Sequence, residues 1–137
     1  MERLIVLVVL TAVAVGIALI LQRRRPDPPS APSYRAPTQL DPDDFPVSAK
    51  APFVVLFGSQ TCESCPGAWS VVTDTVAATG AAIGTARIDV QDDTDLHRRY
   101  RIDGVPTTVI ADGDGVVRQA FFGPITTDEL TAAMIDA

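Results

Sequence analysis

The longest apolar stretch of the chain lies at its N-terminus. Residues 4–21 carry no charged side chain, and only Thr11 and Gly16 interrupt the apolar run. A helix that rises about 1.5 Å per residue spans roughly 27 Å over this stretch, close to the thickness of about 30 Å of a bilayer core. The pattern therefore predicts a single transmembrane helix.

The alternative for this stretch is a cleaved signal peptide. Such a peptide has an apolar part of about 7–15 residues followed by a small-x-small cleavage site. The run here is longer and ends before three arginines at positions 23–25. We therefore expect an uncleaved anchor over residues 1–25 that contacts the lipid bilayer through residues 4–21. Because only Arg3 and the amino terminus supply positive charge before the run, the positive-inside rule slightly favours a cytoplasmic location for the rest of the chain.

A proline-rich segment follows this helix. Seven of the eleven prolines fall between Pro26 and Pro46, mixed with serine, alanine and aspartate. Such a composition cannot bury enough apolar surface to fold, and it favours extended polyproline II backbone. We therefore expect a semi-rigid spacer over residues 26–39 and one folded domain over residues 40–137, a length that allows a single hydrophobic core.

Beyond residue 40, strand-like and helix-like runs alternate. The pattern predicts a buried strand at 53–57, a helix at 62–79, a strand within 82–90, a helix at about 92–100, strands at 107–111 and 116–122 joined by an Asp-Gly-Asp-Gly turn, and a last helix ending at 135. Thr126 and Glu129 have the spacing of a capping box at the start of the last helix. This alternation is typical of an α/β domain.

The net charge of the chain indicates which classes of molecule it is expected not to bind. There are 17 acidic and 11 basic residues, which gives a formal net charge of -6. From residue 40 onward the counts are 15 and 6. An acidic surface repels phosphate backbones, so we expect no nucleic acid as a partner. The basic run at 97–101 is expected to be a solvated helix face, with His97 on the surface.

The only two cysteines, Cys62 and Cys65, stand three positions apart at the predicted start of a helix. A pair this close closes almost no loop, so it stabilises a fold little. The unsatisfied backbone N–H groups and the positive dipole at a helix N-terminus lower the pKa of a thiol and so activate it as a nucleophile. Pro66 suits the first helical turn, where its missing N–H would have no intrahelical partner. We therefore predict that Cys62 attacks a disulfide and that Cys65 resolves the mixed disulfide.

A cysteine pair of this kind can instead be structural or form half of a zinc site. Zinc normally takes four protein ligands in a structural site. His97 is the only histidine, and the sequence contains no second cysteine pair. We therefore expect no metal and no cofactor other than the redox-active disulfide itself.

Two motifs together resemble the thioredoxin superfamily. They are Phe57-Gly58-Ser59-Gln60-Thr61-Cys62-Glu63-Ser64-Cys65 and Gly104-Val105-Pro106-Thr107-Thr108. Over residues 40–137 the chain resembles in particular the membrane-anchored thioredoxin-like oxidoreductases of the TlpA and MauD type. The resemblance implies a thioredoxin-like fold, with a central mixed β-sheet flanked by helices. It also implies disulfide exchange with protein substrates and with an unidentified electron donor or acceptor.

The resemblance further implies where a substrate chain binds. It places a cis peptide bond before Pro106, beside the cysteine pair. The backbone of Val105 would then offer hydrogen bonds to the substrate. Thr61 stands where thioredoxin carries a tryptophan before the first cysteine, so we expect Thr61 to contact the substrate as well.

The chain also departs from the thioredoxin pattern. Leu56 replaces a buried aspartate six positions before the first cysteine, so proton transfer to Cys65 would use water or Glu63. Glu63-Ser64 replaces the Gly-Pro dipeptide between the cysteines. The Glu63 carboxylate disfavours a thiolate at Cys62, and a destabilised reduced form makes the disulfide harder to reduce. The substitution therefore favours a reductant over a strong oxidant.

The main alternative function is a non-catalytic binding module with the same fold. The loss of the tryptophan and of the buried aspartate is compatible with such a module. It would dock a membrane partner in the groove around Val105 and Pro106, without turnover. Replacement of both cysteines would then leave binding unchanged.

Overall fold

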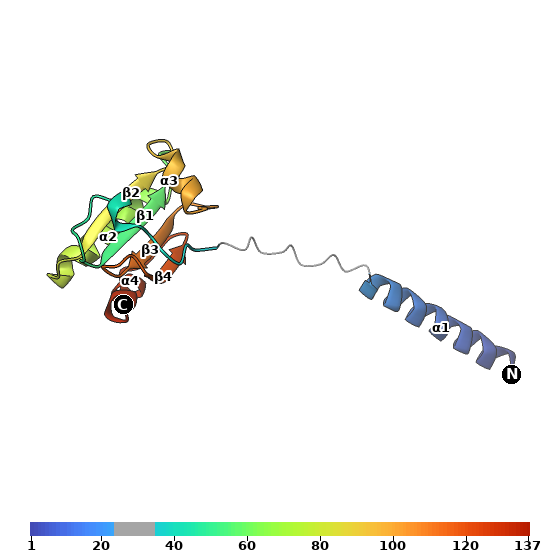
Figure 1. Ribbon diagram of the computed structural model, residues 1–137. Helices are drawn as coiled ribbons and strands as arrows, with labels where there is room; N and C mark the ends of the chain where they lie inside the picture. The colour runs from blue at the N-terminus through green and yellow to red at the C-terminus, as the bar shows by residue number, and fades with distance from the viewer. Residues whose placement is uncertain (24–34) are drawn as a thin grey trace. The chain divides into compact units, whose positions relative to one another are not determined.

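The computed structural model describes residues 1–23 and 35–137, which fall in two separate units (Figure 1). The first unit holds one helix, and the second holds a four-stranded sheet with its helices. The predicted spacer at 26–39 lies largely outside the described residues. The helices and strands are α1 (Glu2–Arg23), the 3-10 turn η1 (Pro42–Asp44), β1 (Phe53–Gly58), α2 (Cys65–Thr79), β2 (Gly84–Asp89), α3 (Thr94–Arg99), β3 (Thr107–Ala111), β4 (Val117–Phe122) and α4 (Thr127–Ile135).

Residues 4–20 of the helix α1 carry no charged side chain on any side of the helix. Its segment Glu2–Ile20 has a mean hydropathy of 2.8, and none of it is buried against protein. A helix that is hydrophobic all round needs apolar surroundings. By length and composition α1 is able to cross a membrane, and a signal or targeting sequence has the same character.

The sheet of the second unit is mixed, as expected for a thioredoxin-like fold. Its strand order is β2-β1-β3-β4. β1 pairs in parallel with β2 and antiparallel with β3, and β3 pairs antiparallel with β4. A parallel pair needs a crossover connection, and α2 supplies it between β1 and β2.

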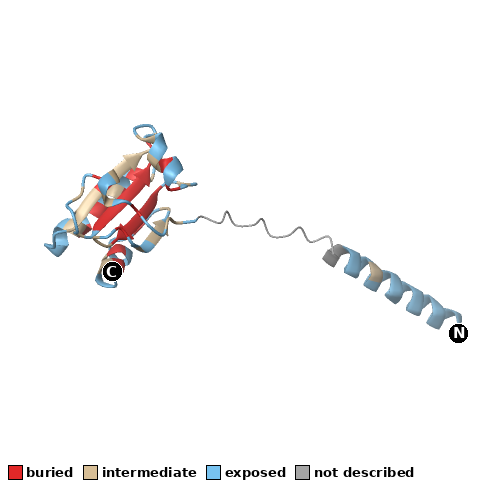
Figure 2. Ribbon diagram, in the orientation of Figure 1, coloured by how far each residue is buried: buried red, intermediate tan, exposed pale blue. Residues whose placement is uncertain are grey.

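The two central strands β1 and β3 are buried on both sides (Figure 2). Successive side chains along a strand point to opposite faces of the sheet. One face, here called the aliphatic face, packs against α2 and α4 and contains Val54, Leu56, Val72, Ile110 and Leu130. The other, here called the aromatic face, packs against α3 and the segment before β1 and contains Phe45, Phe53, Phe57, Val109 and Tyr100.

The segment before η1 belongs to the folded unit. Val117 donates its backbone N–H to the carbonyl of Thr38 at 3.0 Å, and Leu40 donates to Gly115 at 2.8 Å. Gln39 forms an isolated antiparallel bridge with Val116. Thr38 and Gln39, which the proline-rich pattern places in the spacer, therefore contact the edge of the sheet.

The predicted solvated face at 97–101 is wrong for two of its residues. His97 is only 6% exposed, its Nε2 atom lies 2.8 Å from the Ile88 carbonyl, and its ring meets Phe57 edge to face. The ring of Tyr100 is buried, and its hydroxyl donates to Asp44. Both side chains complete the aromatic face, because α3 is a helix of six residues that packs on this side of the sheet.

The expected boundaries of α2 and α4 are met to different degrees. α2 begins at Cys65 and not at Cys62, because Ser64 is the residue whose carbonyl accepts the first helical hydrogen bond, from Ala68 at 3.1 Å. It stops at Gly80, whose φ of 64° is easily reached by glycine. The capping box of α4 is confirmed: Thr126 Oγ1 accepts from the Glu129 N–H, and Glu129 accepts from the Thr126 N–H at 2.8 Å. The Thr126 N–H and hydroxyl both donate hydrogen bonds to the Glu129 carboxylate, and these bonds lower the pKa of Glu129.

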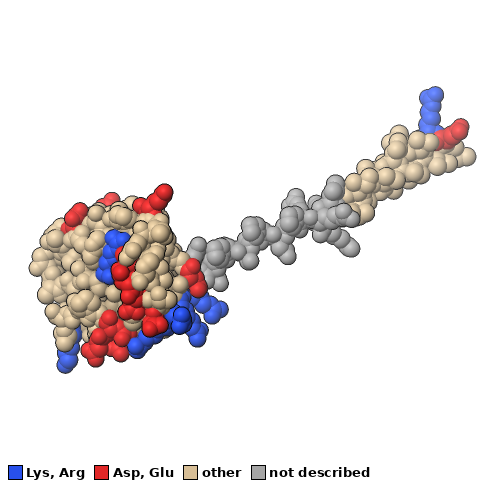
Figure 3. All heavy atoms as spheres, turned by 90° about the horizontal axis from the view of Figure 1, so that it is seen from above, with Lys and Arg blue, Asp and Glu red and all other residues tan. Residues whose placement is uncertain are grey.

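Acidic and basic side chains mix on the face of the folded unit shown in Figure 3. Arg99 lies 3.1 Å from Asp44, and Arg118 lies 2.6 Å from Asp112. Several of the few basic side chains are therefore paired with carboxylates.

Candidate active site

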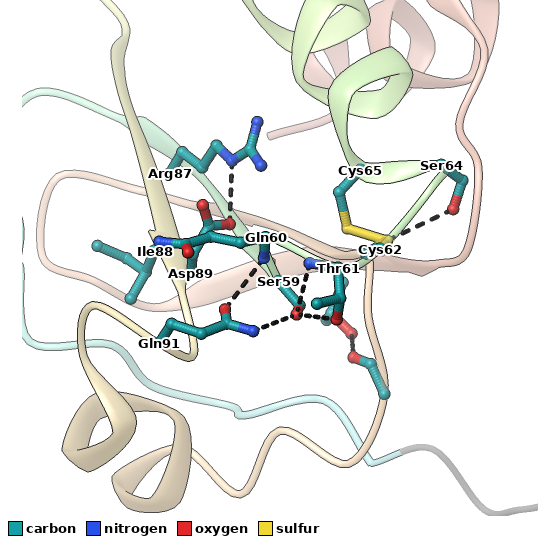
Figure 4. The surroundings of a disulfide bond; sticks show 12 residues. Ser59, Gln60, Thr61, Cys62, Ser64, Cys65, Arg87, Ile88, Asp89 and Gln91 are labelled. Carbon is teal, nitrogen blue, oxygen red and sulfur yellow. Dashed lines mark hydrogen bonds and ion pairs between the residues drawn. A yellow bond between two sulfur atoms is a disulfide. The ribbon is translucent and has the colours of Figure 1, made fainter.

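Cys62 and Cys65 form a disulfide at the N-terminus of α2 (Figure 4). Their Cα atoms are 5.4 Å apart. Cys65 is fully buried, with 0% of its surface exposed, whereas Cys62 is partly exposed. A reagent in solution therefore reaches the Cys62 sulfur more readily than the Cys65 sulfur.

Polar side chains fix the loop between β1 and the cysteines. The Gln91 amide donates to Ser59 Oγ at 2.8 Å and accepts from the Gln60 N–H at 3.0 Å. Ser59 Oγ also lies 3.0 Å from Thr61 Oγ1 and accepts from the Thr61 N–H at 3.3 Å. Thr61 is exposed beside Cys62, so its side chain is accessible to a molecule that approaches the sulfur.

Gln91 was not among the predicted site residues. It follows β2, some 30 positions beyond the loop that it holds. No local sequence signal marks it, because its role depends on the parallel pairing of β1 with β2. Figure 4 shows its amide between Ser59 and Gln60.

Two side chains between the cysteines have different environments. The Ser64 hydroxyl lies 3.7 Å from Cys62 Sγ, within the range of a hydrogen bond to sulfur. A hydroxyl that donates to a thiolate favours the charged form. The Glu63 side chain is exposed, so water screens its charge from Cys62.

A glycine at the end of β1 brings a carboxylate close to the buried cysteine. A Cβ atom at Gly58 would lie 2.8 Å from Asp89 Oδ1 and 3.4 Å from Cys65 Sγ. Asp89 ends β2 and pairs with Gly58. Its Oδ1 atom accepts from Arg87 Nε at 3.0 Å. Asp89 was also missed by sequence reasoning, because the register of the two strands is not visible in the sequence.

The loop before β3 reaches the same end of the sheet. Thr107 pairs with Phe57, next to Gly58 at the end of β1. The Val105–Pro106 peptide bond directly before it is cis, as the resemblance implied. Thr107 Oγ1 donates to the Gly104 carbonyl at 2.7 Å, and Gly123 donates to the Pro106 carbonyl at 2.8 Å, so both sides of the loop are held.

The surface beside this loop is hollowed. Val105 is 38% exposed and Pro106 is buried. The hollow has a volume of about 200 Å³ and is lined by Gly104, Val105, Pro106, Thr107, Phe122 and Gly123. Within residues 1–23 and 35–137, no group of three or more His, Cys, Asp or Glu side chains is arranged to hold a metal ion.

The sequence of this domain matches those of known proteins. The family model described as thioredoxin matches residues 39–136. The mitochondrial thioredoxins of Bos taurus and Mus musculus are 34% identical to the chain over 92 residues, which is 67% of this chain and 55% of each relative. The chain thus spans about half the length of the curated relatives it matches.

Solved structures show the same fold at lower identity. Chloroplastic thioredoxin z has a TM-score of 0.57 at 20% identity and covers 64% of this chain and 79% of its own. A malaria parasite thioredoxin-2 has a TM-score of 0.59 at 15% identity and covers 64% of this chain and 84% of its own.

The mixed sheet with a Cys-x-x-Cys disulfide at the start of α2 defines an α/β domain of the thioredoxin-like class. With the family model matched over residues 39–136, the chain belongs to the thioredoxin family. The Cys62–Cys65 disulfide of this domain is consistent with thiol–disulfide exchange.

Proposed function

We propose that this chain is a membrane-tethered thiol–disulfide oxidoreductase that reduces disulfides in protein substrates through Cys62 and Cys65. The observation that carries the proposal is the unequal exposure of the two linked sulfurs. Cys62 is partly exposed, whereas Cys65 is completely buried. An accessible sulfur is suited to attack an incoming disulfide, and a buried sulfur bonded to it is suited to the intramolecular second step.

The proposed reaction consists of two exchanges. The Cys62 thiolate attacks one sulfur of the substrate disulfide and displaces the other as a thiolate. The Cys65 thiolate then attacks Cys62 Sγ and displaces the second substrate sulfur. The substrate gains two electrons and two protons, and the cysteine pair becomes a disulfide. A dithiol donor must then reduce the pair again.

The loop around Pro106 is the proposed seat of the substrate chain. Val105 precedes the cis bond, and the residue is 38% exposed. The hydrogen bonds that hold Gly104 and Pro106 fix the direction of this backbone before a substrate arrives. Preorganised donors and acceptors lower the entropy cost of binding. Thr61, directly before Cys62 in the chain, is exposed and would contact the substrate as well.

The proposed direction of electron flow is reduction of the substrate. A carboxylate at Glu63 disfavours the reduced form of the pair, which lowers its reduction potential. Solvent weakens this effect, and the nearby Ser64 hydroxyl opposes it. Replacing Glu63 by glutamine should therefore raise the potential by no more than roughly 30 mV, equivalent to about 1.4 kcal/mol. Equilibration with glutathione redox buffers measures the reduction potential of both proteins. A lower potential in Glu63→Gln than in the wild type would contradict the proposed effect of Glu63.

Anchoring through α1 completes the proposal. If α1 is a transmembrane helix, the full chain stays in the bilayer. If α1 is a targeting signal that is cleaved, the rest of the chain does not. We expect the protein to remain in the membrane fraction after extraction with alkaline carbonate, and the C-terminal side to be cytoplasmic. A reporter fused at Ala137 tests the side. A shortened, extractable protein would show that α1 is removed as a signal.

Insulin reduction with dithiothreitol as the electron donor tests the catalytic claim. We expect wild-type protein to accelerate insulin precipitation and Cys62→Ser to do no better than dithiothreitol alone. If the wild type and Cys62→Ser are equally slow, the exchange function is wrong. A partner that co-purifies equally well after replacement of both cysteines would then support the non-catalytic binding module.

A further inference from the structure

The second step of the proposed reaction needs a base for Cys65. The Cys65 side chain is completely buried, and burial disfavours the charged thiolate. Leu56 has no group that accepts a proton, and Glu63 is exposed to solvent. The strand β2, which pairs with β1, supplies another candidate base.

Asp89 reaches toward Cys65 from that strand. Gly58 and Asp89 are paired in the parallel ladder, so their side-chain positions lie on the same face of the sheet. Because one point next to Gly58 lies 2.8 Å from Asp89 Oδ1 and 3.4 Å from Cys65 Sγ, these two atoms are at most 2.8 Å plus 3.4 Å apart. A single bridging water molecule spans such a gap with two hydrogen bonds.

The absence of a side chain at Gly58 keeps this path open. A methyl group there would come within 2.8 Å of Asp89 Oδ1, a distance that forces the carboxylate to move. A side chain at this position would therefore displace the Asp89 carboxylate from its place beside Cys65. Gly58 therefore leaves room between the Asp89 carboxylate and the Cys65 thiol.

The Asp89 carboxylate is held in place and is mostly shielded from solvent. Arg87 Nε donates to its Oδ1 atom at 3.0 Å, and the two side chains are 25% and 12% exposed. The neighbouring carboxylates are engaged elsewhere. Asp92 accepts from the Gln60 amide, and Asp93 accepts from the Leu96 N–H at the start of α3. The nearby imidazole of His97 contacts the Ile88 carbonyl.

We infer that Asp89 is the general base for Cys65 in the resolving step, acting through one water molecule. This inference rests on the proposed function. The Cys65 thiol gives its proton to Asp89, and its sulfur forms a bond to Cys62 Sγ. The bond between Cys62 and the substrate sulfur breaks, and its electron pair leaves on that sulfur. The departing thiolate takes up the proton that Asp89 received from Cys65, and the thiolate displaced in the first step takes a proton from solvent, so the substrate ends as a dithiol and the protein as a disulfide.

A single-turnover reaction of the reduced full chain with Ellman's reagent separates the two steps. The first coloured thiolate is released when Cys62 attacks, and the second when Cys65 resolves the mixed disulfide. In Asp89→Asn we expect the first phase to change less than two-fold. We expect the second phase to slow by about 100-fold near neutral pH, the lower end of what a positioned base contributes. The difference should shrink as pH rises, because hydroxide then removes the thiol proton unaided.

Asp92→Asn is the matched control, since it removes the same charge from the loop that follows β2. We expect both of its phases to equal those of the wild type. Asp89→Glu restores a carboxylate and should recover most of the second phase. Gly58→Ala should slow the second phase because it displaces the carboxylate.

The outcomes separate this inference from the proposed function. If the wild type shows both phases and Asp89→Asn equals it at every pH, Asp89 is not the base. An equally slow second phase in Asp89→Asn and Asp89→Glu, with no dependence on pH, would also overturn the assignment, because it would indicate a structural role. If the wild type shows no second phase, the exchange function itself fails. Should Asp89→Asn not fold, Gly58→Ala carries the test, and an unchanged second phase in it would overturn the inference.

Discussion

The two faces of the sheet use their polar groups in different ways. On the aromatic face the rings of Phe45 and Tyr100 stack at 5.9 Å, and Phe57 meets His97 at 5.4 Å. The Tyr100 hydroxyl donates to Asp44 and accepts from the Asp41 N–H. The polar groups of Tyr100 and His97 thus have structural partners.

The aliphatic face carries polar groups that its packing does not need. Its core consists of alanine, valine, leucine and isoleucine side chains from the sheet, α2, α4 and the segment before α4. Near Gly58 it ends in the Cys62–Cys65 disulfide and the Arg87–Asp89 ion pair. The aromatic face thus holds its polar groups in structural hydrogen bonds, whereas the aliphatic face places reactive groups at its end. Substitutions on the two faces should therefore separate stability from exchange chemistry.

We expect the largest loss of stability when a ring is removed from the aromatic face. Phe57 is fully buried and contacts Phe45, Tyr100 and His97. Phe57→Ala leaves a cavity and should lower the free energy of unfolding by about 3–5 kcal/mol. Urea titration measures the loss, and Val116→Ala at the exposed edge should stay within about 0.5 kcal/mol. Similar small losses in both variants would show that this face does not dominate stability.

A smaller loss is expected from the aliphatic face. Val72 in α2 is fully buried beneath the sheet. Val72→Ala removes two methyl groups, so the free energy of unfolding should fall by about 2 kcal/mol, with the rate of the Cys62 attack unchanged. Urea titration and the first phase with Ellman's reagent test both parts. A rate that falls in proportion to stability would contradict the separation.

The Tyr100 hydroxyl tests the polar edge of the aromatic face. Tyr100→Phe removes two hydrogen bonds and should cost about 1 kcal/mol. Burial, followed by the hydrogen bond to Asp44, raises the pKa of Tyr100 from 10.0 to about 12. A raised folded pKa contributes stability below pH 10 that is lost as pH rises toward 12. Thermal unfolding across this range should show the alkaline loss in the wild type and not in the variant; an identical slope in both would contradict it.

The smallest effect is expected at the start of α4. Hydrogen bonds from Thr126 lower the pKa of Glu129. A lowered folded pKa contributes stability above the ordinary carboxyl pKa, and this is lost as pH falls. Glu129→Gln should therefore reduce the melting temperature slightly at neutral pH and not at acid pH. An equal reduction at both would mean that the charge of Glu129 plays no part.

Local patterns in the sequence predict most elements of this fold. β3 was expected at 107–111, and the capping box of α4 follows from Thr126 and Glu129 alone. His97 was misplaced because a short helix with basic neighbours gives no signal of which side is buried. α2 was placed one turn too early, since a proline is tolerated at several positions of a first helical turn.

The sequence predicted those site residues that lie close together in a single motif. Cys62 and Cys65 are close in the sequence, and Val105–Pro106 follows from a family resemblance. Gln91 and Asp89 meet the cysteine loop because β1 and β2 pair in parallel with Gly58 opposite Asp89. That register depends on packing across the sheet, which no local pattern reports. The loss of a carboxylate at Leu56 thus concerns one strand only, and the neighbouring strand supplies the group.

Trapping of a substrate tests the central claim most directly. Cys65→Ser removes the resolving sulfur and leaves Cys62 able to attack, so a mixed disulfide should accumulate. After incubation with a disulfide-containing peptide, mass spectrometry of the Cys65→Ser protein should find the peptide linked to Cys62, and the Cys62→Ser protein should carry none. Peptide linked to Cys65 in the Cys62→Ser protein, with none on Cys62 in the other variant, would contradict the account.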